Sequence, residues 1–333
     1  MHPLQKLRID GFILAILATV VLASVFPASA SFAPSLDKIV TAAIALLFFL
    51  YGARMHPQEA IRGLQHWRLH VLILAFTFVC FPIIGIALRV LEPHVLTSDL
   101  YTGVLYLTLV PSTVQSSIAF TSMARGNVAG AIVSASASNL LGVLLTPLLV
   151  IAMTSTGIIG GGGSISISGQ SMIDICLQIL APFVVGQLAR PVVGGWVEGH
   201  RAKLKYVDRG SIVLVVYAAF SKGVRDGIWH AVDAGQIAVL VVLSVLLVAV
   251  LLWLTWHVAA RLGFDRADRI TAQFCGTKKS LASGLPMAAV LFAGHQVSII
   301  VLPLMVFHQV QLMMCSWLAG RYAAEPEDAT AVA

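Results

Sequence analysis

The sequence predicts an all-α polytopic membrane protein with ten transmembrane helices in two five-helix inverted repeats, in which two discontinuous helices, the fourth and the ninth, cross each other. Three observations support this fold class. Hydrophobic residues make up 58% of the 333 residues and charged residues 11%, whereas soluble domains contain about 25% charged residues. Apolar runs recur along the whole chain. A polar stretch with two adjacent lysines, residues 273–286, interrupts one of these runs.

Ten apolar runs are long enough to cross a hydrocarbon layer and are bounded by charged or turn residues. The first run has a second interpretation as a secretory signal, because Lys6 and Arg8 precede it and Ala28-Ser29-Ala30 resembles a cleavage site. We favour a retained span, because its removal would leave one repeat without its first helix. The predicted spans cover residues 11–29, 38–54, 70–91, 100–123, 128–153, 172–190, 211–228, 234–260, 270–292 and 296–320.

The basic residues orient these spans. With the N-terminus inside, fifteen of the 21 arginines and lysines fall on the cytoplasmic side and four on the outer side, and the remaining two, Lys278 and Lys279, are buried. This excess predicts an integral protein of the plasma membrane, the inner membrane in a bacterium, with both termini cytoplasmic. The basic residues are scattered over short loops, so the net charge of +6 indicates the lipid bilayer rather than nucleic acid as a partner. The oligomeric state is not predicted.

The two halves are separated by an uncharged stretch that contains four consecutive glycines, Gly160 to Gly163. No Gly-Lys-Ser/Thr motif follows them, so they indicate a flexible outer linker rather than a phosphate-binding loop. The halves resemble each other, since Pro147 in the fifth span and Pro303 in the tenth occupy corresponding places. The predicted division is 1–155 for the first repeat, 156–171 for the linker, 172–321 for the second repeat and 322–333 for a cytoplasmic tail.

The ninth span contains charge at a depth where charge is costly. Lys278 lies about nine residues after Arg269, which is about 14 Å at the helical rise and near the middle of a layer roughly 30 Å thick. A charge there costs at least about 2.5–3.5 kcal/mol, so it must face protein or water. Gly276 and Thr277 offer a place to unwind. We therefore interpret this span as a broken helix that lines a polar cavity.

The fourth span contains a matching polar segment, Pro111 to Ser117. Ser116 lies about nine residues before Arg125, which places it at a similar depth. The fourth and ninth spans run in opposite directions across the membrane. Interrupted helices at matching positions of oppositely oriented halves predict the binding site of a secondary transporter.

The candidate substrate- or ion-binding residues lie at the two interruptions and on the polar face of the fifth span, a face that also contains Ser136 and Asn139. For the serines, the alternative is close packing and bonding within their own helix. For the lysines, the alternative is a structural role in which main-chain carbonyls hold the ammonium groups. The candidates are Gln115, Ser116, Ser117, Ser134, Ser138, Thr277, Lys278, Lys279 and Ser280, supported by Thr77, Gln273 and Gly276.

Ion chemistry at this site is unusual. No acidic residue lies near the middle of a predicted span, and Asp174 lies at the outer edge of the sixth, although ordinary sodium and proton pumps use a buried carboxylate. A buried lysine could supply the charge of a bound cation, tether an anionic substrate or titrate. No cofactor is predicted, and a sodium ion would have Ser116, Ser117 and Thr277 as candidate ligands. Three histidines could bind a metal ion, but no glutamate motif accompanies them; they are His56, His66 and His70.

Nearly the whole chain resembles the bile acid:sodium symporter family. The motifs that carry the resemblance are Ala124-Arg125-Gly126-Asn127-Val128-Ala129, Leu145-Thr146-Pro147, residues 77–82 and Ser280-Leu281-Ala282. Phe274-Cys275-Gly276-Thr277-x-Lys279-Ser280, followed by Gly284-x-Pro286-Met287, resembles the bacterial and eukaryotic branch typified by solute carrier family 10 member 7. The resemblance implies a core domain from spans 3–5 and 8–10, a panel domain from spans 1, 2, 6 and 7, and sodium sites where the broken helices cross.

The chain departs from the family pattern at those sodium sites. Alignment on Ser280 places Phe274 where the family has its sodium-binding glutamate, and Thr77 where the family often has a glutamine ligand. The family's Gly-Gly-Thr-Ala-Ser-Asn is replaced by residues 112–117, which lack the asparagine. These departures weigh against sodium coupling and give no support to bile acid as the substrate.

The favoured function is secondary active transport of a small organic anion, of symporter type, by alternating access, because the buried charges are positive. The alternative is a membrane regulator of ion homeostasis, calcium in particular, that transports nothing itself. Enzymatic activity is not expected, because no acid, base or metal cluster can be placed at one depth.

Overall fold

The computed structural model describes residues 11–54, 66–159, 173 and 176–325. Every regular element within these ranges is a helix, as the all-α fold class predicts. The predicted glycine linker from residue 160, Asp174, His56 and most of the tail lie outside the described residues. The elements are α1 (Gly11–Val25), α2 (Ala33–Arg54), α4 (Trp67–Ala75), η2 (Phe76–Cys80), α5 (Phe81–Ala87), η3 (Leu88–Leu91), α6 (Ser98–Leu109), α7 (Gln115–Met123), α8 (Val128–Ser155), η4 (Cys176–Leu180), α10 (Ala181–Gly199), α11 (Arg201–Arg225), α12 (Ile228–Ala231), α13 (Ala234–Arg261), α14 (Arg266–Gly276), α15 (Leu281–Leu291) and α16 (Val297–Ala324).

Six helical segments within the described residues are long and apolar enough to cross a membrane: 33–54, 67–91, 128–155, 177–199, 234–261 and 297–324. The chain is therefore a polytopic membrane protein. Four predicted spans are not among the six. The first contains the shorter apolar helix Leu14–Val25, and the seventh lies in α11, which begins with several charged residues. The fourth and ninth are each divided into two short helices. The count of ten spans stays a prediction.

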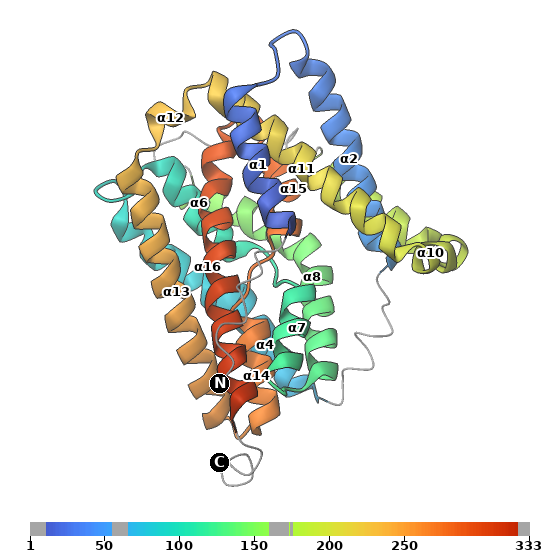
Figure 1. Cartoon of the computed structure of the whole chain (residues 1–333), viewed down its shortest axis with the longest axis vertical. Coiled ribbons are helices and arrows are strands. Elements are labelled where there is room, and N and C mark those ends of the chain that lie inside the picture. Colours follow the sequence, from blue (N-terminus) through green and yellow to red (C-terminus); the bar gives the residue numbers. More distant parts are fainter. Residues whose placement is uncertain (1–10, 55–65, 160–172, 174–175, 326–333) are drawn as a thin grey trace.

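The elements form two groups that lie side by side (Figure 1). One contains α13, α16, α14, α4, α7 and α8, and the other contains α1, α2, α10 and α11. The α2 and α10 helices approach each other most closely at two glycines. A Cβ atom on Gly52 would overlap the carbonyl oxygen of Phe183, and one on Gly186 would overlap that of Phe49. Small residues allow such close helix contacts in membranes.

The segment from α4 to η3 contains a π-helical turn that releases one carbonyl. In this turn the Phe81 N–H bonds the carbonyl of Phe76, five residues back, instead of that of Thr77. The next residue, Pro82, has no N–H to donate. The Thr77 carbonyl is therefore left without a donor from its own helix. Such π turns are frequent at functional sites.

Both predicted interruptions are present. The α6 helix ends at Leu109 because the next residue, Val110, precedes Pro111 and is extended, with ψ 154°. The chain becomes helical again at Gln115, where α7 begins. In the second interruption α14 ends at Gly276, and the Ser280 hydroxyl caps α15 by accepting from the Ser283 N–H. Each interruption thus leaves a helix C-terminus and a helix N-terminus near each other.

Candidate functional site at the crossed interruptions

The two interruptions contact each other directly. The Ser112 hydroxyl donates to the Cys275 carbonyl at 2.7 Å, and the Ser280 N–H donates to the Pro111 carbonyl at 2.8 Å. The crossing therefore joins the first interruption to the second through main-chain and side-chain hydrogen bonds. Residues 271–280 are all buried.

Lys279 is fully buried at the centre of this crossing. Its Nζ atom donates to the carbonyls of Thr77 at 2.8 Å, Thr108 at 2.7 Å and Val110 at 2.9 Å. The same atom lies 4.1 Å from the centre of the Phe81 ring, whose face attracts a cation. The ammonium group thus has an acceptor for each of its three hydrogens.

The carbonyls of residues 108–112 at the first interruption are all paired, although the end of a helix normally leaves its last carbonyls without intrahelical donors. Lys279 binds those of Thr108 and Val110, and Ser280 binds that of Pro111. The α8 helix supplies the remaining donors. Its Thr146 hydroxyl binds the Leu109 carbonyl at 2.8 Å, and its Asn139 amide binds the Ser112 carbonyl at 2.6 Å.

Lys278 is also fully buried but has a smaller set of partners. Its Nζ atom donates to the Ser116 carbonyl at 2.7 Å and lies 3.7 Å from the centre of the Phe120 ring. Both contacts belong to α7. Lys278 therefore connects the second interruption to α7, the second half of the first broken helix, whereas Lys279 connects it to α6 and the π turn.

Two polar residues of α16 hold the main chain at Lys279. The Gln311 amide accepts from the Lys279 N–H and donates to the Lys279 carbonyl, both at 2.8 Å. The His308 Nδ1 atom lies 2.9 Å from the Gln311 Nε2 atom and 3.3 Å from the same carbonyl. This bidentate contact replaces the helical hydrogen bonds that the unwound chain has lost.

A cavity of about 1340 Å³ begins at the crossing. Its inner wall contains Ser116, Asn139, Ser280 and His308, and apolar side chains such as Leu140, Val143 and Leu312 lie between the polar ones. Two half-helices begin at this wall, α7 at Gln115 and α15 at Leu281. The free N–H groups and positive dipole ends of such N-termini favour anions.

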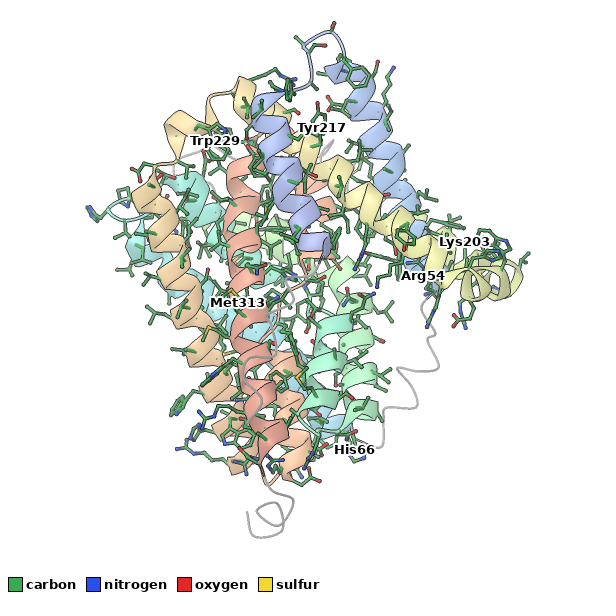
Figure 2. The ribbon with its side chains drawn as sticks, viewed as in Figure 1. Arg54, His66, Lys203, Tyr217, Trp229 and Met313 are labelled. Carbon is green, nitrogen blue, oxygen red and sulfur yellow. The ribbon has the colours of Figure 1, made fainter. Side chains whose placement is uncertain are left out.

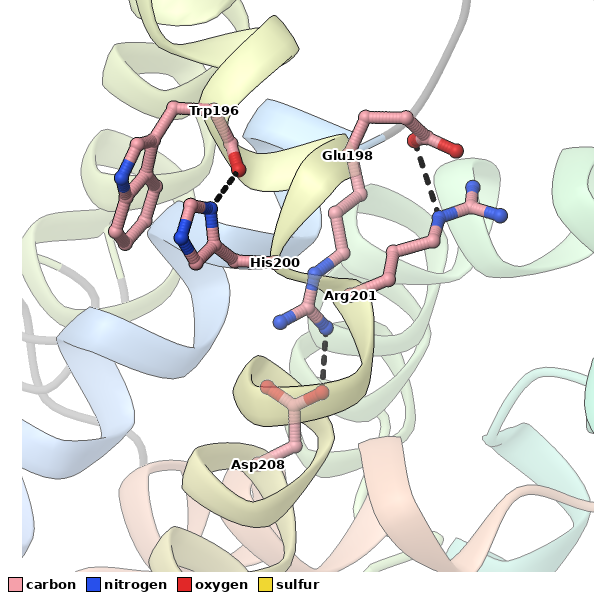
Figure 3. Close-up of polar contacts among 6 residues, drawn as sticks. Trp196, Glu198, His200, Arg201 and Asp208 are labelled. Carbon is pink, nitrogen blue, oxygen red and sulfur yellow. Dashed lines mark hydrogen bonds and ion pairs between the residues drawn. The ribbon is translucent and has the colours of Figure 1, made fainter.

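The far end of the cavity is basic. Two lining residues mark the extent of the cavity in Figure 2: Met313 lies midway along α16, and Arg54 lies well apart from it, at the end of α2 beside α11. Among the described lining residues Asp208 is the single acidic one, and it forms an ion pair with Arg54. Arg201 binds Glu198 at 3.1 Å on the adjoining helix end (Figure 3). The basic residues that line this end are Arg54, Arg201, Lys205 and Arg209.

The structure separates the predicted site residues into three groups. Gln115, Ser116 and Ser280 line the cavity. Ser117, Thr277, Lys278 and Lys279 are buried behind its wall, and Ser138 supports it by accepting from the Ser112 N–H at 3.0 Å. The remaining candidates lie against other helices. Thr77 gives its carbonyl to Lys279, while its hydroxyl bonds the Ile73 carbonyl of its own helix. Ser134 bonds His70 at 2.6 Å, Gln273 donates to Leu252 and accepts from Tyr322, and Gly276 packs near Phe76.

The three candidate sodium ligands differ in how they are engaged. The Ser116 and Ser117 hydroxyls both bond the Thr113 hydroxyl, at 2.7 and 3.2 Å. The Thr277 hydroxyl is buried without a hydrogen-bond partner among the described residues. Within the same part of the chain there is no group of three His, Cys, Asp or Glu side chains that could hold a metal ion. Neither of the two interrupted spans, residues 100–123 and 270–292, contains an Asp or Glu that could balance an added cation.

The sequence predictions omitted Gln311 and His308, which hold the main chain of Lys279. A detectable signal was present, because the two residues stand three apart in a mainly apolar span and so share one helix face. The polar partners on α8 were predicted only in part. The sequence placed both Ser138 and Asn139 on the polar face of the fifth span, but it did not predict that Asn139 bonds the first interruption and also accepts from Ser283 at 2.8 Å.

A polytopic helical protein in which two interrupted helices meet beside a polar cavity has the features of a membrane transporter. The chain belongs to the SBF-like CPA transporter family, whose sequence profile matches residues 10–324. It is therefore a member of a transporter family and not an enzyme. The predicted family resemblance is confirmed.

Full-length relatives agree with this assignment. The Escherichia coli protein YfeH, provisionally named a symporter, is 48% identical over 319 residues, which cover 96% of this chain and 94% of the relative. An uncharacterised Pseudomonas aeruginosa protein, PA2026, is 50% identical over 322 residues, with 97% and 95% covered. Sodium/bile acid cotransporter 7-B of Xenopus laevis is 27% identical over 328 residues, with 96% and 93% covered.

Proposed function

We propose that the protein is a secondary active transporter of symporter type that moves a small organic anion across the bacterial inner membrane by alternating access. The observation that carries this proposal is the cavity of about 1340 Å³ that joins the crossed interruptions to a basic end. Ligand pockets of proteins usually measure about 300–1,000 Å³. The cavity is large enough for a small organic solute and its water.

The charges around the cavity support an anionic substrate. Four basic side chains line its far end, and Asp208, the single acidic side chain among the described lining residues, is paired with Arg54. At the inner wall the N-termini of α7 and α15 add positive potential without adding mobile charge. In this proposal Gln115, Ser116 and Ser280 contact the substrate, and the buried residues behind them hold the wall in shape.

The position of the cavity supports alternating access. One wall comes from α7, α8, α15 and α16, which the proposal assigns to the core domain. The opposite wall comes from α2 and α11, which it assigns to the panel domain. Rotation of the core against the panel would close one end and open the other. The ten spans in two inverted repeats, with both termini cytoplasmic, belong to the same proposal, and the basic end then faces the cytoplasm.

Counterflow in proteoliposomes tests this function. Purified protein would be reconstituted and screened with labelled organic anions, with labelled organic cations and neutral solutes of similar size as controls. The expected result is saturable counterflow of at least one anion and a higher melting temperature in its presence. Protein that stays folded but shows neither flux nor stabilisation with any solute would contradict the proposal and favour a regulator of ion homeostasis.

A further inference from the structure

We infer that the Lys279 ammonium group is a tethered cation that takes the place of a coupling sodium ion at the crossing. The inference deepens the transport function proposed above and rests on it. It concerns how the interrupted helices are held together, and it predicts that the protein binds its substrate without sodium.

The first support is the chemistry of the three acceptors. Unwound carbonyls and the C-terminal ends of half-helices are the groups that coordinate sodium in transporters with broken helices. The Lys279 Nζ atom occupies such a position, because Thr108 and Val110 lie at the C-terminal end of α6. The negative end of the helix dipole points at the ammonium group.

The third acceptor is the Thr77 carbonyl, which the sequence of its own helix leaves without an intrahelical donor. The π turn directs the Phe81 N–H to Phe76, and Pro82 has no N–H, so the Thr77 carbonyl is left for an external donor. That donor is Lys279, 202 residues away in the chain. An irregular turn that frees one carbonyl, aimed at a buried cation, indicates a built cation site rather than an incidental contact.

A separate cation would not fit beside the ammonium group. Lys279 is fully buried, and its Nζ atom is within 2.9 Å of all three carbonyls. A sodium ion bound by the same oxygens would occupy the position of the Nζ atom. Among the described residues no Asp or Glu stands at the crossing to compensate a second positive charge. The residues present therefore disagree with a sodium ion at this position.

Lys278 provides a matched comparison. It is the adjacent residue and equally buried, yet one carbonyl, that of Ser116, accepts from its ammonium group. Its other partners are the aromatic rings of Phe120, at 3.7 Å, and Phe274, at 5.6 Å. The three-carbonyl arrangement is thus a property of Lys279 and not of every lysine in the interruption.

The experiment measures melting temperature in detergent at constant ionic strength, with sodium, n-propylammonium or choline chloride. For the native protein we expect equal melting temperatures in sodium and choline. Lys279→Ala removes the tethered charge and leaves an empty space where the side chain was. The melting temperature of this variant should therefore fall by several degrees in choline and rise saturably with sodium or n-propylammonium. Lys279→Met, which fills the volume with an uncharged chain, and Lys278→Ala should show no such recovery.

Three outcomes would overturn the inference. Higher stability of the native protein in sodium than in choline would show that a free sodium ion binds, and this arm decides the matter even if Lys279→Ala does not fold. A folded Lys279→Ala protein whose melting temperature does not change with sodium or n-propylammonium would show that the three carbonyls do not form a cation site. Equal recovery of Lys278→Ala would make the effect non-specific. None of these measurements requires a substrate, so failure of the transport proposal would appear separately, as absent counterflow.

Discussion

The hydroxyl group of Ser112, in the first interruption, donates a 2.7 Å hydrogen bond to the main-chain carbonyl of Cys275, in the second. The two residues are 163 positions apart in the chain. Both are fully buried, so neither partner can exchange this bond for one with bulk water. The bond lies where the two broken helices cross, and it makes the stability of the crossing directly measurable.

Ser112→Ala should destabilise the protein by about 1–3 kcal/mol, because the Cys275 carbonyl would stay buried without its donor. Thermal unfolding in detergent would measure the loss. Ser155→Ala is the control, since the Ser155 hydroxyl is exposed and bonds only the Ala152 carbonyl of its own helix. Equal melting temperatures for the two variants would mean that the crossing bond contributes nothing to stability.

Gln311→Leu should cost more than Gln309→Leu. The first change removes both hydrogen bonds to the Lys279 main chain, and each unpaired buried group costs about 1–3 kcal/mol. The second change removes an amide oxygen that has no hydrogen-bond partner among the described residues. Melting temperatures of both variants, measured in the same detergent, provide the comparison. A larger loss for Gln309→Leu would be inconsistent with the main-chain role of Gln311.

Gly186→Ala should weaken the contact between α2 and α10, because the new Cβ atom would overlap the Phe49 carbonyl oxygen. Such overpacking typically costs about 1–3 kcal/mol. Gly195→Ala, on the same helix, meets nothing within 4 Å and serves as the control. The expected result is a lower melting temperature and lower yield for the first variant alone. Comparable behaviour of both variants would show that the two helices separate easily.

Lys205→Ala should reduce anion transport by raising KM about 3- to 10-fold, which corresponds to roughly 0.7–1.4 kcal/mol. Lys205 lines the basic end of the cavity, where its charge attracts anions. Lys203 is exposed on the same helix but does not line the cavity, and Lys203→Ala is the matched control (Figure 2). The difference between the variants should shrink at high salt, because screening weakens such attraction. An equal KM for both variants would argue against electrostatic recruitment at this end.

The interruptions were predictable because their causes are local. A residue before proline avoids the helical region, so Val110-Pro111 ends a helix whatever surrounds it. Two adjacent lysines in an apolar run cannot both avoid lipid on a regular helix, so the break near Gly276 followed from burial cost alone. The orientation of the spans, their division into repeats and the binding roles of the candidate residues stay predictions.

The partners of the site residues were less predictable. Ser134 and Ser138 are four positions apart on α8, yet one bonds His70 and the other the first interruption. Polar periodicity places two such residues on one face of a helix, but it does not say which neighbouring helix each will meet. Gln311 and His308, which hold the main chain of Lys279, lie on the last helix of the chain and share no sequence motif with Lys279.

The sequence by itself determined that this protein is a helical membrane protein with two broken helices, because hydrophobic length, charge burial and proline geometry act within a few residues of the chain. Its motifs, rather than these physical effects, indicated the transporter family. Only the tertiary structure decided what the buried lysines do. Lys279 binds carbonyls of Thr77, Thr108 and Val110 rather than lining the cavity. That outcome depends on unpaired carbonyls of two other helices meeting one ammonium group, and such a meeting is set by packing across the fold.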